Sequence, residues 1–157
     1  MLYQSPSYGE INTDGLKKRV SYYMTEKKDA HYRIIVGSDS QKVNGSHYDF
    51  VVAIAIHRVG AGGIYFWKRD IVSKKMSLKE RMYEEAIRSL VSAETIFELF
   101  RENGISKYNI EIHVDIGRNG DTRDMIAEIV GMVRSNGYEV KIKPDSFGAS
   151  KVADRHT

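Results

Sequence analysis

Two aspartates stand where apolar stretches of this chain end. Asp39 follows the apolar run that stops at Gly37, and Asp115 closes the alternating run YNIEIHVD. A carboxylate at the end of a buried strand is costly to desolvate unless a cation neutralises it, and a hard divalent cation does so well. Each aspartate alone is explained more simply as a turn or cap residue, because Asp is common in turns. The pair indicates a site if the fold brings both together.

Three consecutive strands and a long helix are predicted in the first two thirds of the chain. Residues 32–37, 48–58 and 64–72 are short apolar or β-branched runs separated by turn residues, so we expect an antiparallel meander. A helix then begins after Ser77, where Glu80 completes a capping-box pattern, and ends at the Asn-Gly pair 103–104.

The remaining elements alternate between helix and strand. They are a helix over residues 12–29, a strand over 108–115, a helix from Asp121 or Thr122 to Asn136, and a strand over 138–143. The predicted fold is an α/β domain whose mixed five-stranded sheet, in βββαβαβ order, is flanked by helices. We expect one domain over residues 1–157, with residues 1–30 as an N-terminal helical extension.

A third carboxylate comes from the long helix. The first and fourth strands are natural neighbours in this topology, so Asp39 and Asp115 would face each other, and such like charges disfavour ionisation unless a cation lies between them. At 100° per residue, Glu85 lies on the flank of the apolar stripe of the helix, whereas Glu84 points to the solvent side. Glu80 and Glu94 are also available, although Glu80 has its capping role, and Glu85 is the better choice. A surface salt bridge with Arg81 or Arg88 is the alternative explanation for this glutamate. Oxygen ligands favour Mg²⁺ or Mn²⁺ over zinc, and two such ions can hydrolyse a phosphodiester.

Several polar residues could contact a phosphate near these carboxylates. Candidate substrate-binding residues are Ser40 and Gln41 beside Asp39, Lys74 and Lys75 in the loop before the long helix, and Arg118 and Arg123 in a glycine-rich turn that enters a helix. Ser and Gln in a turn need no function. The run Tyr65–Trp67 is followed by two cations and could stack on bases, but core packing is favoured because alternate strand residues face opposite sides.

Composition excludes several classes of protein. The 157 residues include no cysteine, which excludes disulfide scaffolds and thiol catalysis. No apolar run approaches the ~20 residues of a membrane helix, and the first residues lack a secretory signal, so a cytoplasmic protein with no membrane partner is expected. The net charge of +3 permits a polyanionic partner without requiring one.

Three segments resemble the YkuK family of ribonuclease H-like proteins. They are IIVGSDSQ, EIHVDIGRNGDTRDMI and VKIKPDSFGASKVADRHT, and the βββαβαβ order agrees with that fold. The resemblance implies a nuclease in which four carboxylates hold two Mg²⁺ or Mn²⁺ ions. It places these at Asp39, Glu85, Asp115 and Asp154.

The fourth carboxylate is the least fixed by the residues. After Asp154 only three residues follow, too few for a full C-terminal helix, so Asp145 or Asp121 could substitute for it. His156 lies close to Asp154 and could protonate a leaving group, although an ordinary surface histidine is the simpler interpretation.

Two functions therefore compete. The first is a metal-dependent nuclease or phosphodiesterase that hydrolyses nucleic acid with two metal ions. The alternative is a non-catalytic nucleic-acid-binding or protein-interaction module on the same fold. The residues do not distinguish RNA, DNA or hybrid substrates, and they leave the oligomeric state open.

Overall fold

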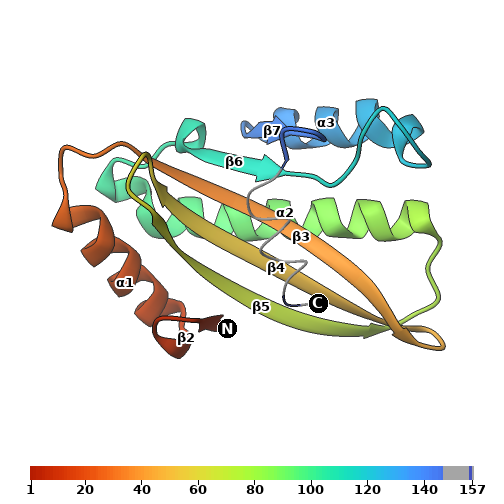
Figure 1. The fold of residues 1–157 in the computed structure, drawn as a ribbon, viewed down its shortest axis with the longest axis horizontal. Helices are drawn as coiled ribbons and strands as arrows, with labels where there is room; N and C mark the ends of the chain where they lie inside the picture. The colour runs from red at the N-terminus through yellow and green to blue at the C-terminus, as the bar shows by residue number, and fades with distance from the viewer. Residues whose placement is uncertain (147–155, 157) are drawn as a thin grey trace.

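One seven-stranded mixed sheet organises the chain in the computed structural model, which describes residues 1–146 and 156 (Figure 1). The strand order is β2-β1-β5-β4-β3-β6-β7. The strands are β1 (Leu2–Ser5), β2 (Gly9–Asn12), β3 (Tyr32–Asn44), β4 (His47–Arg58), β5 (Gly63–Ser73), β6 (Ile110–His113) and β7 (Glu139–Lys141). The α-helices are α1 (Thr13–Glu26), α2 (Leu78–Phe100) and α3 (Ile126–Ser135), and short 3-10 turns span Arg101–Asn103, Lys107–Asn109 and Arg123–Met125.

The central strands form the predicted meander. β3 pairs antiparallel with β4, and β4 pairs antiparallel with β5. The chain then returns through α2, so that β6 lies parallel to β3 and β7 parallel to β6. The predicted adjacency of the first and fourth strands of the five-strand motif, which are β3 and β6 here, is confirmed.

All three α-helices contribute to the core on one face of the sheet. Leu16 of α1, Ile96 of α2 and Ile129 of α3 are fully buried in the same cluster as Ile54 and Phe66 of the sheet. Burying each such side chain contributes about 1.5–3 kcal/mol. Ser77 caps α2 as predicted, because the backbone N–H of Glu80 donates to the Ser77 hydroxyl at 3.1 Å.

The opposite face of the sheet carries a smaller apolar cluster. It contains Ile35, Val51 and Ala53, with Ala55 and Trp67 packed against them. Phe66 faces the helices, whereas its neighbour Trp67 faces away from them. The favoured interpretation of the aromatic run as alternating core packing agrees with this arrangement.

Two predictions about the strands are wrong in extent. Residues before α1 contain a β1–β2 hairpin, which adds two strands at the edge of the sheet beside β5. The strand predicted to stop at Gly37 continues to Asn44, so Asp39 lies inside β3 rather than in a turn. Pairing with β4 along this whole length overrides the local turn preference of Ser, Asp and Gln. The turn lies instead at Gly45, whose φ of 47° suits glycine.

Among the described residues, none of the helices combines the length and apolar character that a membrane span requires.

Candidate active site at a fork in the sheet

β3 and β6 separate in the middle of the sheet. Their pairing runs from Ile34 opposite Ile110 to Gly37 opposite His113 and stops there. β3 continues toward Asn44, whereas the chain after β6 leaves the sheet. Asp39 and Asp115 each lie two residues beyond this last pair, one on each branch of the fork. Although Asp39 is not at a strand end, the two predicted aspartates are therefore in matching positions.

Glu85 comes to the fork from α2, beneath the sheet. Its side chain is 3% exposed, and Ser40 donates a hydrogen bond of 2.5 Å to Oε2 of Glu85. Arg81 holds Ser40 in turn, through a 2.9 Å bond to the Ser40 carbonyl and a 3.3 Å contact with its hydroxyl. One turn further along α2, the Ser89 hydroxyl lies 2.7 Å from that of Ser38. Small polar residues thus join α2 to β3 around the glutamate.

The negative charges of Asp39 and Asp115 both act on the buried Glu85. Burial raises the pKa of Glu85 to about 8. The Ser40 hydrogen bond and the Arg81 charge lower this pKa, whereas the negative charges of Asp39 and Asp115 raise it. Ser38 and Ser40 face α2, so strand alternation places Asp39 on the opposite side of β3. The charge of Asp39 therefore acts on Glu85 from the other side of β3.

The donor chemistry of this site fits a hard divalent cation. All three groups offer oxygen ligands, and a bound cation would oppose the burial and repulsion that raise the pKa of Glu85. Within residues 1–146 and 156, no three His, Cys, Asp or Glu side chains already form a metal-binding group. In the described part of the chain, the three carboxylates therefore do not form a ready-made metal site. Asp39 and Asp115 are linked to Glu85 by the effect of their charges on its pKa.

Asp115 has a cation at its side that the sequence analysis missed. Nζ of Lys143 lies 3.2 Å from Oδ1 of Asp115, and the two side chains are 56% and 44% exposed. Lys143 follows β7, so the loops after two adjacent parallel strands meet here. The available signal was the end of the run YEVKIK before Pro144, but nothing in the sequence specified which carboxylate Lys143 contacts.

The proposed salt bridge of Glu85 with an arginine of its own helix is not the arrangement found. Arg81 contacts Ser40, as described above. Arg88 pairs with Glu84 at 2.9 Å and with Asp70 at 2.8 Å. Glu85 is turned instead toward β3, as its place on the flank of the apolar stripe predicted.

The remaining predicted residues lie around the fork or outside the described part of the chain. Ser40 is engaged by Glu85. The other five candidate substrate contacts, Gln41, Lys74, Lys75, Arg118 and Arg123, are exposed, and so are the alternative carboxylates Asp121 and Asp145. Asp154 lies outside the described residues, and its role as a ligand stays a prediction.

His156 lies on β5. Its ring stacks on Trp67 with centroids 4.4 Å apart, and its Nε2 is 3.0 Å from the Tyr65 hydroxyl. Arg69 also donates to its backbone carbonyl. Trp67 of β5 lies opposite Ala53 of β4, which lies opposite Gly37 of β3. Trp67 is therefore two strands, or about 10 Å, from Gly37. Proton donation by His156 to a leaving group stays a prediction.

A family model and a curated relative identify the family of this chain. The family model described as "Ribonuclease H-like" matches residues 16–157. The Bacillus subtilis (strain 168) protein named "Uncharacterized protein YkuK" is 30% identical, over 99% of this chain and 96% of its own length. The solved N-terminal RNase H domain of Rv2228c from Mycobacterium tuberculosis, fused to maltose-binding protein, is 9% identical with a TM-score of 0.37, covering 80% of this chain and 96% of its own. By the family model and the YkuK relative, this chain belongs to the ribonuclease H-like family as a YkuK-type member.

Proposed function

We propose that this protein is a metal-dependent nuclease that hydrolyses phosphodiester bonds at the fork between β3 and β6. The observation that carries the proposal is the buried Glu85, whose pKa is raised to about 8 by burial and further by the charges of Asp39 and Asp115 from two other segments. A strongly perturbed carboxyl beside other charges is a frequent mark of a functional site. Membership of the ribonuclease H-like family supports the same reaction.

In this proposal Asp39, Glu85 and Asp115 hold Mg²⁺ or Mn²⁺, with Asp154 as a further ligand. Two such ions activate a water and stabilise the leaving oxygen of a phosphodiester. Ser40 and Arg81 orient Glu85, since their contacts fix the carboxylate against β3. Burial of Glu85 keeps bulk water from one side of the site.

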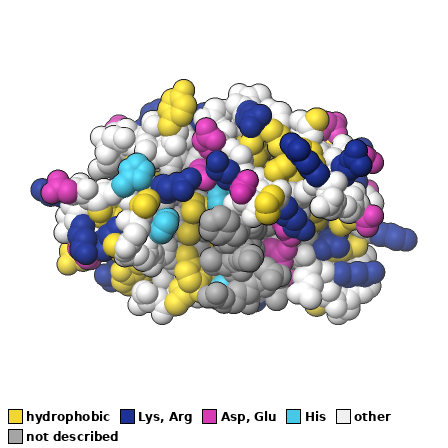
Figure 2. Space-filling view, turned by 45° about the horizontal axis from the view of Figure 1, so that its top comes forward, with side chains coloured by type: hydrophobic (Ala, Val, Ile, Leu, Met, Phe, Trp, Pro, Cys, Tyr) yellow, Lys and Arg dark blue, Asp and Glu magenta, His cyan; other side chains and the backbone are white. Residues whose placement is uncertain are grey.

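Nucleic acid is the proposed substrate class, although its exact form is not specified by the site. Arg118 and Arg123 lie exposed in the segment between β6 and α3, which follows the fork, and Lys74 and Lys75 lie exposed before α2, past the Asn44 end of β3. Figure 2 shows basic side chains interspersed with acidic ones over the visible face, which fits the modest net charge of +3. Local contacts near the fork, rather than one broad basic surface, would then position the nucleic-acid substrate.

Cleavage of a labelled panel of nucleic acids tests this function. The panel contains single-stranded, duplex, hybrid and branched substrates, each with Mg²⁺, Mn²⁺ or chelator. We expect metal-dependent cutting that falls at least ~100-fold in Asp39→Asn, because loss of a supporting residue alone costs about 10–100-fold at metal sites. Asp29→Asn makes the same charge change at an exposed position in the turn after α1 and should cut normally. Full activity in Asp39→Asn would contradict the assignment.

A non-catalytic binding module is the second candidate, and the Lys143–Asp115 ion pair favours it. There the protein supplies its own cation to one of the three carboxylates. Thermal melting with and without Mg²⁺ or Mn²⁺ separates the two functions. A metal at 100 times its Kd stabilises the native state by about 2.7 kcal/mol. A nuclease should show this rise in Tm and lose it in Asp39→Asn, whereas a binding module should show none.

A further inference from the structure

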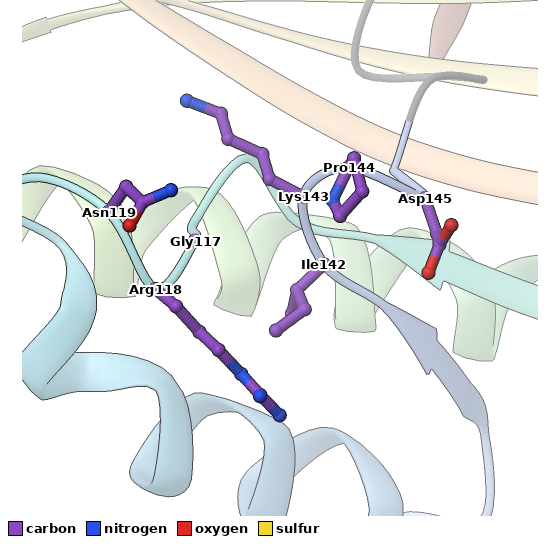
Figure 3. Close-up of a pocket in the computed structure, with 7 residues that line it drawn as sticks. All are labelled: Gly117, Arg118, Asn119, Ile142, Lys143, Pro144 and Asp145. Atoms are coloured by element: carbon purple, nitrogen blue, oxygen red, sulfur yellow. The ribbon is translucent and has the colours of Figure 1, made fainter.

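A cavity of about 490 Å³ opens beside Asp115, outside the three-carboxylate site. Its lining is Gly117, Arg118, Asn119, Ile142, Lys143, Pro144 and Asp145 (Figure 3). The wall is formed by two loops, one after β6 and one after β7. In sheets with parallel strands, ligands bind outside the carboxyl ends of the strands, and this cavity lies at two such ends.

The two loops are fastened to each other by backbone hydrogen bonds. Val114 donates to the Lys141 carbonyl at 2.9 Å, and Lys143 donates to the Ile116 carbonyl at 2.8 Å. Gly117 allows the close approach, because a Cβ there would lie 3.0 Å from Cβ of Lys143. The stem of Lys143 therefore packs on the glycine, and the cavity wall is a built feature rather than a chance gap.

The lining combines two cations with apolar surface. In Figure 3 the Lys143 and Asn119 side chains lie on one side of the wall, with those of Arg118 and Ile142 on the other. Ile142 and Pro144 supply apolar surface, and Asp145 lies at the end of the wall beyond Pro144. Phosphates of a nucleic-acid strand alternate with sugars and bases. Cations on the two sides of a wall that also offers apolar surface match that alternation.

We propose that this cavity binds one nucleotide unit of a single-stranded segment, next to the phosphate that is cut. Lys143 contacts the phosphate nearer the fork, Arg118 contacts the phosphate on the other side, and the sugar and base lie against Ile142 and Pro144. The inference rests on the proposed function, since it names the substrate contacts of that same site. The volume of the cavity is within the ~300–1,000 Å³ typical of small-molecule sites.

Lys143 would have two successive partners. Without substrate its ammonium neutralises Asp115 at 3.2 Å. With more than half of the side chain exposed, it can turn from Asp115 to a phosphate of an incoming nucleic-acid strand, with or without a metal ion present. This residue is then a substrate-binding cation that also offsets the negative charge of Asp115 before the nucleic acid binds.

Binding of a fluorescein-labelled 12-mer of single-stranded DNA, and of the same RNA, tests the inference. Fluorescence anisotropy is measured in EDTA at several salt concentrations, so that the readout does not depend on cleavage. Each neutralised phosphate contributes about 0.7 to the slope of log K against log salt for a single strand. We expect Lys143→Met and Arg118→Met each to reduce the slope by about that amount and to weaken binding roughly fivefold. Lys143→Met retains the stem that packs on Gly117.

Lys18→Met is the matched control, because it removes one exposed cation from α1, remote from the cavity. It should leave the slope unchanged. If Lys143→Met and Arg118→Met behave like Lys18→Met while the wild type binds and cuts, the cavity assignment is wrong and the nuclease stands. Cavity-dependent binding without any cutting in metal would support the cavity and contradict the nuclease. A wild type that does not bind either 12-mer overturns the cavity assignment.

Discussion

Two glutamates on α2, nine residues apart, have opposite electrostatic surroundings. Glu85 is 3% exposed, and burial raises its pKa to about 8. The Glu94 side chain is 40% exposed, and a 2.7 Å hydrogen bond from Tyr138 lowers its pKa, assisted by Lys107 at 3.2 Å. One helix thus carries a carboxylate whose charge is favoured and another whose charge is opposed.

Under the proposed function, this difference in surroundings separates a structural glutamate from one in the metal site. Glu94 ties α2 to Tyr138, just before β7, and to the 3-10 turn of Lys107, and its charge has matched partners. Glu85 has a hydroxyl donor and Arg81 nearby, yet burial and the negative charges of Asp39 and Asp115 still raise its pKa. Evolution of a stable helix alone would not require a glutamate there. A site that must receive a cation does require one.

The largest expected contrast is in catalysis. Glu85→Gln and Glu94→Gln make the same chemical change on the same helix. Glu85→Gln should lower metal-dependent cleavage at least ~100-fold, because it removes a ligand charge, whereas Glu94→Gln should cut at the wild-type rate. Single-turnover cleavage at saturating metal measures both.

This comparison is informative because both variants can be checked for folding by circular dichroism. Equal loss of activity in the two folded variants would contradict the distinction between them. Normal cleavage by Glu85→Gln would remove Glu85 from the metal site.

Stability without metal should change in the opposite order. At pH 8.5 in EDTA, Glu85→Gln removes an opposed buried charge and should stabilise the protein by at least about 1 kcal/mol, a Tm rise of roughly 3 °C. Glu94→Gln should lower stability by about 1 kcal/mol, since it weakens the bonds from Tyr138 and Lys107 at a partly exposed, solvent-screened position. Thermal melts of both variants beside the wild type measure these shifts.

The pH dependence fixes the sign of each effect. The pKa of Glu85 is raised in the folded state, so the folded protein binds the extra proton between its ordinary value of 4.5 and about 8, and its stability falls as pH rises through that window. The pKa of Glu94 is lowered, so its contribution is present above the ordinary value and is lost as pH falls. The Tm gain of Glu85→Gln should therefore shrink toward pH 5. A gain that is constant with pH would mean that ionisation is not its cause.

The local sequence pattern predicted much of the arrangement of the candidate site. The flank of an apolar stripe distinguished Glu85 from Glu84, and strand order placed Asp39 and Asp115 on neighbouring strands. The extension of β3 through Asp39 was missed, because pairing with β4 decides it and the local residues favour a turn.

The residues that contact the carboxylates could not be predicted from the sequence either. Ser40 was predicted to contact substrate, but its hydroxyl bonds to Glu85, 45 residues away. Lys143 meets Asp115 only because β6 and β7 are parallel neighbours. Such pairings depend on tertiary register, and no periodicity in one chain encodes them.

The smallest expected effects come from two serines that join α2 to β3. Ser40→Ala removes a hydrogen bond that lowers the pKa of Glu85, so this pKa should rise further and metal affinity should fall about 10-fold. Ser89→Ala removes the partner of Ser38 at 2.7 Å and should cost about 1 kcal/mol of stability without moving the pH profile. Cleavage measured from pH 6 to 9 should therefore shift to alkaline pH in Ser40→Ala alone. A shift of equal size in both variants would mean that the serines act through general packing of α2 on the sheet, and that Glu85 is not held by Ser40 for catalysis.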